Sequence, residues 1–136
     1  MKTHIKRALV LSAIISFSLS CQTDRADIQT GIIALVNVGS GDCMPGIDYS
    51  KRLYSQYSGR VYIIQKKEYD KPGNTIESLK NKSIERIIQN GVLAIALKPD
   101  SFVVFLDNTY ESSCVIYLKK NSLIKTPFYF FRCTSY

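Results

Sequence analysis

Several features that carry chemistry in other proteins are missing from this 136-residue sequence. Its only histidine is His4, so a mature chain without its first residues has no histidine-based metal site and no Ser-His-Asp or Cys-His catalytic arrangement. It has no G-x-S-x-G, P-loop or G-x-G-x-x-G motif, and its acidic residues are spread singly. These absences argue against a hydrolase or a transferase, and we expect neither a metal nor a cofactor.

Glycine and proline are also scarce, with seven and four residues, which excludes collagen-like or linker-type composition. No apolar run reaches the roughly 18 residues that a membrane-spanning helix needs. Hydrophobic residues make up 46% of the chain and charged residues 21%. This balance predicts one compact domain.

The first 20 residues have the order of a signal peptide: basic residues, an apolar run over Ala8–Phe17, and small residues before Cys21. The end of this segment resembles a bacterial lipobox, in which the cysteine thiol is acylated and becomes the first mature residue. The alternative is an ordinary secretory signal cleaved near Ser20, which leaves Cys21 as a thiol. We expect a signal peptide over 1–20, a lipidated tether over 21–29 and a domain over 30–136. The expected location is the bacterial cell envelope, lipid-anchored, on the periplasmic side or at the outer membrane.

Net charge does not indicate a nucleic-acid partner. The formal charge is +7, but residues 1–20 hold three of the 18 basic residues and none of the 11 acidic ones, which leaves +4 for the mature chain. The pairs Lys66-Lys67 and Lys119-Lys120 are too short for a phosphate-binding stripe and are typical of solvated strand ends. We expect exported or periplasmic proteins as partners, membrane attachment through the lipid, and no nucleic acid.

The first half of the domain predicts a strand, a helix and a second strand. The β-branched run 31–38 is typical of a central strand buried on both faces, and the glycines of 39–42 end it. Pro45 suits the first turn of a helix, predicted over 44–57. A second strand follows at 61–64, and the three elements would form a βαβ unit.

The second half predicts an amphipathic helix over 76–88, closed by Asn90-Gly91. The runs 92–97 and 102–106 are either two short strands or the end of a helix followed by one strand. Residues 114–118 and 123–131 predict a closing β-hairpin. The fold class is therefore α/β, a single domain with a mixed sheet of four or five strands and two or more helices.

The most informative segment is 41–46, between the first strand and the predicted first helix. A thiol at a helix N-terminus meets unpaired backbone N–H groups and the positive end of the helix dipole, and both favour the thiolate. Cys43 is therefore the candidate catalytic nucleophile. Asp42 beside it would raise the thiol pKa unless it turns aside to cap the helix.

At these residues the chain resembles the thioredoxin-like superfamily, in particular the exported, lipid-anchored thiol-disulfide proteins of the TlpA type. In that family a Cys-x-Pro-Cys or similar motif opens the first helix. Cys43 matches the attacking cysteine, Pro45 matches the proline, and Gly46 stands where the second cysteine would be. The resemblance covers roughly residues 31–132 and implies a membrane-anchored envelope protein that exchanges disulfides through Cys43. The family's cis-proline has no counterpart directly before residue 115.

Export sets the redox context, because disulfides persist outside the cytoplasm. With Cys21 assigned to lipid, three thiols remain, Cys43, Cys114 and Cys133, and their spacing matches no zinc ribbon or finger. The sequence leaves three arrangements open. Cys114 could serve as a resolving thiol, Cys43 could form a structural disulfide with Cys114 or Cys133, or Cys43 could be a vestigial thiol.

Two functions follow from these arrangements. A thioredoxin-like thiol-disulfide exchange protein predicts an accessible Cys43 with a depressed pKa. A non-catalytic binding or assembly module predicts a Cys43 that is buried or permanently bridged. The nine tyrosines and six phenylalanines, including those of 128–131, are interpreted as strand and core filling, with an exposed aromatic edge for partner binding as the alternative.

Overall fold

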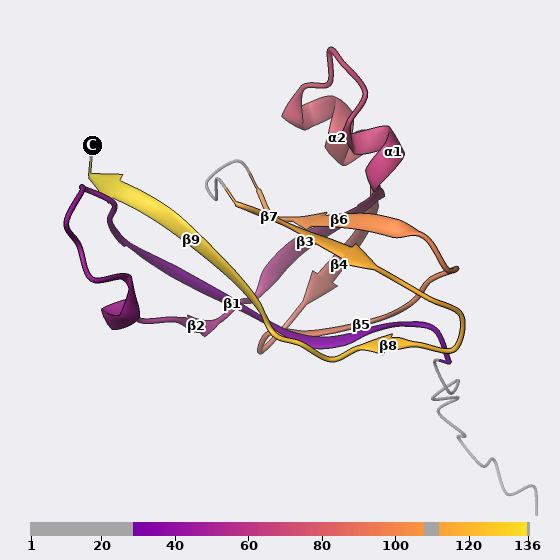
Figure 1. The fold of residues 1–136 in the computed structure, drawn as a ribbon, viewed down its shortest axis with the longest axis horizontal. Coiled ribbons are helices and arrows are strands. Elements are labelled where there is room, and N and C mark those ends of the chain that lie inside the picture. The colour runs from indigo at the N-terminus through magenta and orange to yellow at the C-terminus, as the bar shows by residue number, and fades with distance from the viewer. Residues whose placement is uncertain (1–28, 108–111, 136) are drawn as a thin grey trace, which may run out of the picture.

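The computed structural model describes residues 29–107 and 112–135, which form two sheets and a pair of short helices (Figure 1). The predicted signal peptide, Cys21 and most of the predicted tether lie outside these residues. Within the described ranges, neither helix has the length and apolar character needed to cross a bilayer.

A five-stranded mixed sheet is built along one long strand, β1 (Gly31–Asp42). The first half of β1 pairs antiparallel with β5 (Val92–Ala96) and parallel with β8 (Leu123–Ile124). Its second half pairs antiparallel with β2 (Ser55–Gln56) and parallel with β9 (Phe128–Ser135). Segments from the two ends of the domain therefore lie side by side.

Only one face of β1 is buried. Ile32 and Val36 have no exposed surface, whereas Ile33 and Leu35 between them keep 41% and 39%. The prediction of a strand buried on both faces is therefore wrong, because the outward side chains in the first half of β1 remain about two-fifths exposed. The predicted end at 39–42 is also wrong, since β1 continues through both glycines to Asp42.

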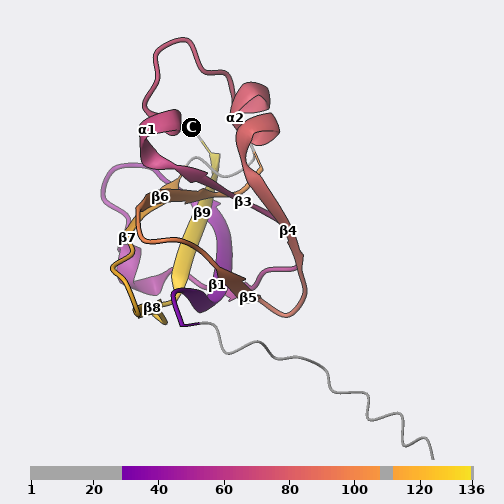
Figure 2. The ribbon, with the colours of Figure 1, turned by 90° about the vertical axis from the view of Figure 1, so that its right-hand side faces the viewer.

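The second sheet is antiparallel, in the order β4 (Ile84–Ile88), β3 (Gly59–Gln65), β6 (Ser101–Phe105) and β7 (Ser113–Tyr117). Its two central strands are buried on both faces, so their continuous apolar runs are explained by position. One face packs on the five-stranded sheet. The helices cover the other (Figure 2).

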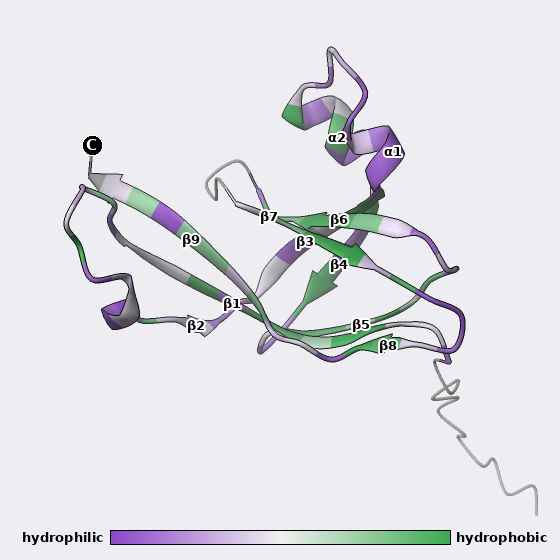
Figure 3. Cartoon of the chain, viewed as in Figure 1, coloured by the Kyte–Doolittle hydropathy of each residue, from purple (hydrophilic) through white to green (hydrophobic). Residues whose placement is uncertain are grey.

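The helices α1 (Lys66–Tyr69) and α2 (Ile76–Lys82) are inserted between the neighbouring strands β3 and β4. The buried Leu79 and the partly buried Ile76 pack α2 on the sheet, in a small cluster that includes the stacked rings of Tyr62 and Phe105, 5.4 Å apart. The helical region is otherwise largely hydrophilic, and hydrophobic colour gathers in the strands (Figure 3).

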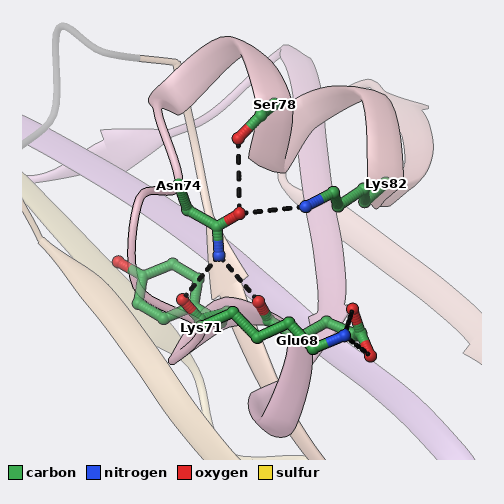
Figure 4. A network of polar contacts seen from close by, with 6 residues as sticks. Glu68, Lys71, Asn74, Ser78 and Lys82 are labelled. Atoms are coloured by element: carbon green, nitrogen blue, oxygen red, sulfur yellow. Dashed lines mark hydrogen bonds and ion pairs between the residues drawn. The ribbon is translucent and has the colours of Figure 1, made fainter.

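The turn between the helices is fixed by one amide side chain. Asn74 donates from Nδ2 to the carbonyl oxygens of Glu68 and Tyr69, at 2.8 and 3.2 Å, and accepts from Ser78 and Lys82 through Oδ1 (Figure 4). It thus replaces backbone hydrogen bonds that the chain loses where α1 ends. The insertion holds its shape through this network because it has little core of its own.

The main core lies between the two sheets and takes one face from each. Its buried members are all apolar. They are Ile32, Ala34, Val36, Val61, Ile63, Ile88, Leu93, Ile95, Phe102, Val104, Leu106, Ile116, Leu118, Phe128 and Phe130.

Three predictions about helices and connections are corrected. The segment 44–57 contains a 3₁₀ turn (Tyr49–Lys51) and the short strand β2 instead of an α-helix, because its apolar residues do not form one stripe for a helix to bury. The βαβ unit is wrong, since β1 and β3 lie in different sheets. The helix over 76–88 ends at Lys82, and the β-branched residues that follow form β4 instead.

The predicted closing hairpin is also wrong. Residues 113–117 pair with β6, whereas 123–124 and 128–135 run parallel to β1 in the other sheet. Of the two alternatives for 92–97 and 102–106, the pair of strands is confirmed as β5 and β6. An α/β fold with a mixed sheet and two helices is therefore confirmed, but the strands form two sheets rather than one.

Candidate functional site

A narrow ribbon projects from the body of the molecule, and we call it the arm (Figure 1). It consists of residues 36–42 of β1 and 128–135 of β9, paired in parallel from Val36 opposite Phe128 onward. Residues 43–54, which we call the covering loop, leave the tip of β1 and return along the arm to β2. Beyond Val38 the inner side of the arm carries exposed polar residues such as Ser40 and Arg132, so the core does not hold it.

A disulfide ties the covering loop to the arm. Cys43 is bonded to Cys133 of β9, with Cα atoms 5.4 Å apart and 90 positions between them in sequence. Of the pairings left open by the sequence, the structure therefore has Cys43 with Cys133. The prediction that Cys43 opens a helix is wrong: Cys43 lies in the loop before Pro45, and the first helical turn along the described chain is Tyr49–Lys51.

Arg52 binds the covering loop to the arm through stacking. Its guanidinium lies 3.7 Å from the ring centre of Phe131 and 4.2 Å from that of Tyr49, so the cation is held between two aromatic faces. Its Nη2 atom lies 3.5 Å from the Sγ atom of Cys43. The positive charge is thus placed beside the disulfide.

The glycines of β1 make room for this stack. A Cβ atom at Gly39 would lie 3.0 Å from the ring of Phe131, and one at Gly41 would lie 3.3 Å from it, so the ring rests directly on the backbone of β1. Tyr54 then packs edge-on against Phe131 and Tyr129, with centroids 6.0 and 5.1 Å apart. Glycine in a strand commonly marks such a close approach.

A shallow pocket of about 280 Å³ opens where the covering loop meets the arm. Asp48, Lys51 and Arg52 all line it, so charges of both signs are present. Hydrogen bonds from the hydroxyl and backbone N–H of Ser50 hold the pKa of Asp48 below its ordinary value, and Lys51 lies 3.6 Å from its carboxylate. The pocket therefore has no clear preference for an anion or a cation.

The remaining described cysteine is separate from the disulfide. Cys114 lies half-buried on β7, and burial raises the pKa of its thiol, while a hydrogen bond from the backbone of Tyr129 acts in the opposite direction. A raised pKa keeps the thiol protonated and weakly nucleophilic. Cys133, not Cys114, is the residue brought to Cys43. In the described part of the chain no group of three histidine, cysteine, aspartate or glutamate residues is placed to hold a metal ion.

The outward side of the five-stranded sheet and the covering loop expose most of the large apolar side chains. We call the part formed by Ile33, Leu35, Val92 and Tyr129 the outer face. Eight of the twelve exposed large hydrophobic residues among those described belong to this side. They are Ile33, Leu35, Met44, Tyr49, Leu53, Tyr54, Val92 and Tyr129.

Sequence reasoning missed this surface because apolar residues occupy both faces of β1, so its pattern does not alternate. The sequence shows the two glycines at 39 and 41 and the aromatic run 128–131, but only the structure shows that these two segments pair.

Comparison with known proteins leaves the function to be inferred from this geometry. No family model, no curated protein and no solved structure matches the chain.

Proposed function

We propose that the mature chain is a lipid-anchored, non-catalytic module of the bacterial cell envelope that binds an exported protein through the outer face. The observation that carries this proposal is the unpartnered apolar side of the five-stranded sheet, with Leu35 39% and Tyr129 53% exposed. Soluble monomers rarely leave contiguous apolar surface in water, and such patches commonly mark interaction sites.

The chemistry of this side suits protein binding. Tyrosine and arginine are enriched in protein interfaces, where they supply large contact areas that lose little side-chain freedom. Tyr54, Tyr129 and Arg52 are already ordered by their ring contacts and stacking. A surface ordered before binding loses less conformational entropy on association. In this proposal the Cys43–Cys133 disulfide is a permanent brace for the arm.

The proposed anchor places the module at a membrane. Acylation of Cys21 leaves the polar segment up to Gln29 as a short tether ahead of β1. The arm then points away from the point of attachment, because the described chain enters β1 at Gly31 and the arm includes its other end, Asp42 (Figure 1). A partner in the envelope can reach the arm in this orientation.

Site-specific crosslinking in intact cells tests the binding surface. A photo-activatable residue is placed at Leu35 or Tyr129, and the matched control is placed at Tyr117, which is 66% exposed on β7 of the other sheet. We expect one defined adduct from the first two positions and none from Tyr117. Adducts of equal yield from all three positions, or from none, contradict the proposal.

The same disulfide supports a second candidate function, thiol-disulfide exchange by a thioredoxin-like lipoprotein in which Cys133 takes the place of the missing motif cysteine. The observation in its favour is the guanidinium of Arg52 beside Cys43, since a neighbouring cation stabilises a thiolate after reduction.

Redox titration separates the two candidates. For a structural brace we expect a reduction potential below about −300 mV in glutathione or dithiothreitol buffers, and no catalysis of insulin reduction. A potential near about −200 mV, together with insulin reduction that is lost in Cys43→Ser and kept in Cys114→Ser, would establish exchange instead.

A further inference from the structure

Four exposed lysines surround the point where the tether enters the domain. Lys98 follows β5, Lys119 and Lys120 lie in the turn between β7 and β8, and Lys125 follows β8. We call these four residues the lysine-rich end. They come from three different connections, so the chain order alone does not group them.

Hydrogen bonds to Thr30 and Gly31 hold these connections beside the start of β1, where the chain enters the domain. The N–H of Leu97 donates to the carbonyl oxygen of Thr30 at 3.0 Å, and the N–H of Asn121 donates to the side-chain hydroxyl of Thr30 at 2.9 Å. The N–H of Gly31 donates to the carbonyl oxygen of Ser122 at 3.1 Å. The lysine-rich end is therefore fixed beside the last residue of the tether.

None of the four lysines forms an ion pair with a carboxylate of the described residues. Four lysines elsewhere, Lys51, Lys66, Lys71 and Lys80, each have an acidic partner, whereas Lys67 and Lys82 form no ion pair with a described carboxylate either. The nearby carboxylate of Asp100 accepts from Gln65 and from the backbone of Ser101 instead. The lysine-rich end thus presents four cations that no direct ion pair with a described carboxylate neutralises.

We propose that the lysine-rich end docks on a membrane leaflet that contains anionic lipid headgroups, an inference that rests on the proposed acylation of Cys21. The nine positions from Cys21 to Thr30 span at most about 30 Å when extended, so this end of the domain meets the membrane first. Clustered lysines within a Debye length of about 8 Å of an anionic surface are attracted to it.

Docking at this end also orients the arm, which carries Tyr129 of the outer face. Twelve residues of β1 separate Gly31 from Asp42, and a strand rises about 3.3 Å per residue, which places the tip of the arm roughly 35 Å from the tether. The arm then stands away from the lipid. A membrane-docked lysine-rich end and a free arm are therefore compatible in one orientation.

Vesicle sedimentation of the unacylated mature chain, Cys21→Ala, tests the docking without any lipid anchor. The probes are vesicles of phosphatidylcholine alone and of phosphatidylcholine mixed with phosphatidylglycerol. We expect binding to the anionic vesicles only, with loss of binding in about 1 M salt, where the Debye length falls to about 3 Å. Each Lys→Gln substitution in the lysine-rich end should weaken the partition coefficient about fivefold.

A charge-matched control removes four other exposed lysines, Lys51, Lys67, Lys71 and Lys82, by Lys→Gln substitution. This control has the same net charge as the fourfold variant of the lysine-rich end, and we expect it to keep most of the binding. Equal binding to both kinds of vesicle, or an equal loss in the two fourfold variants, overturns the proposal.

Mass spectrometry of the wild-type N-terminal peptide reports the acylation of Cys21 separately. An acylated Cys21 without vesicle binding by the Cys21→Ala chain overturns the docking and leaves the anchor in place. An unmodified Cys21 with vesicle binding removes the anchor and leaves the docking.

Discussion

The two sheets of this molecule are stabilised in different ways. The two central strands of the four-stranded sheet are covered on both faces, and Val61, Tyr62, Ile63 and Ile64 of β3 are all at most 4% exposed. The five-stranded sheet is covered on one face only, and its arm extends beyond the core. The first sheet is held by apolar burial, whereas the end of the second is held by a disulfide and a stacked arginine.

This difference assigns stability and the proposed binding to different regions of the molecule. A surface that is buried on both sides cannot bind a partner, and the part of the arm beyond Val38, which the core does not hold, needs another source of order. The Cys43–Cys133 bond and the stack around Arg52 supply that order without covering the outer face. The comparison therefore predicts that the two regions respond to different perturbations.

Breaking the disulfide should have the largest effect. Cys43→Ser opens a link across 90 positions, and the chain-entropy model assigns about 4 kcal/mol to a loop of that length. Urea denaturation measures the loss in the free energy of unfolding, and Cys114→Ser is the matched control because Cys114 is unpaired. Hydrogen exchange should become faster in the arm than in β3. A loss below about 1 kcal/mol, or uniform acceleration, would show that the arm does not depend on the bond.

Adjacent aromatic residues of β9 should differ sharply in how much they contribute to the free energy of unfolding. Phe130 points into the core with no exposed surface, and Tyr129 points outward with 53% exposed. We expect Phe130→Ala to lower the free energy of unfolding by about 3 kcal/mol and Tyr129→Ala by at most about 1 kcal/mol. The same denaturation assay reads both. Similar losses in the two variants would mean that the outer face is not a free surface.

The sequence predicted the elements that depend on local pattern and failed on those that depend on distant partners. The strand at 61–64 was recognisable because its apolar run is short and rich in β-branched residues, whereas the runs 92–97 and 102–106 were left as two strands or as a helix end followed by one strand. The pairing of β9 with β1 was not, because it joins parallel segments about 90 residues apart and leaves no local signal. The helix over 44–57 was predicted from Pro45 and from apolar residues that cluster only loosely at helical spacing, and these residues do not form a stripe that a helix could bury.

The sequence identified the cysteines of the candidate site but not the residues that pack around them. Cys43 stood out by its position after a buried strand, and Cys133 was considered as its partner, but spacing cannot choose among three thiols. Arg52 carried no signal, since its role depends on Phe131 lying across two glycines of another strand.

A smaller effect should come from the stack that joins the covering loop to the arm. Arg52→Ala removes two cation–π contacts and the packing of the side chain, and we expect a loss of about 1 to 2 kcal/mol. Lys51→Ala is the matched control, because the neighbouring side chain is 82% exposed and pairs only with Asp48. It should change the free energy of unfolding by at most about 0.5 kcal/mol. Equal losses in the two variants would show that the stack does not stabilise the arm.

The smallest effect is on the pH dependence of the free energy of unfolding. Cys114 contributes to it because its thiol can titrate, whereas the bonded Cys43 and Cys133 do not. Burial raises the pKa of the Cys114 thiol above its ordinary value in the folded protein, so the unfolded chain ionises first as the pH rises. Unfolding then releases a proton, and the free energy of unfolding falls as the pH rises from the ordinary thiol pKa through the folded one. Below that window the thiol is protonated in both states and contributes no slope. Subtracting the curve of Cys114→Ser from that of the wild type isolates this term, because Cys43 and Cys133 do not titrate while they are bonded. A difference curve that stays flat between pH 8 and pH 10, about the range in which an ordinary thiol ionises, would place Cys114 in solvent rather than against the core.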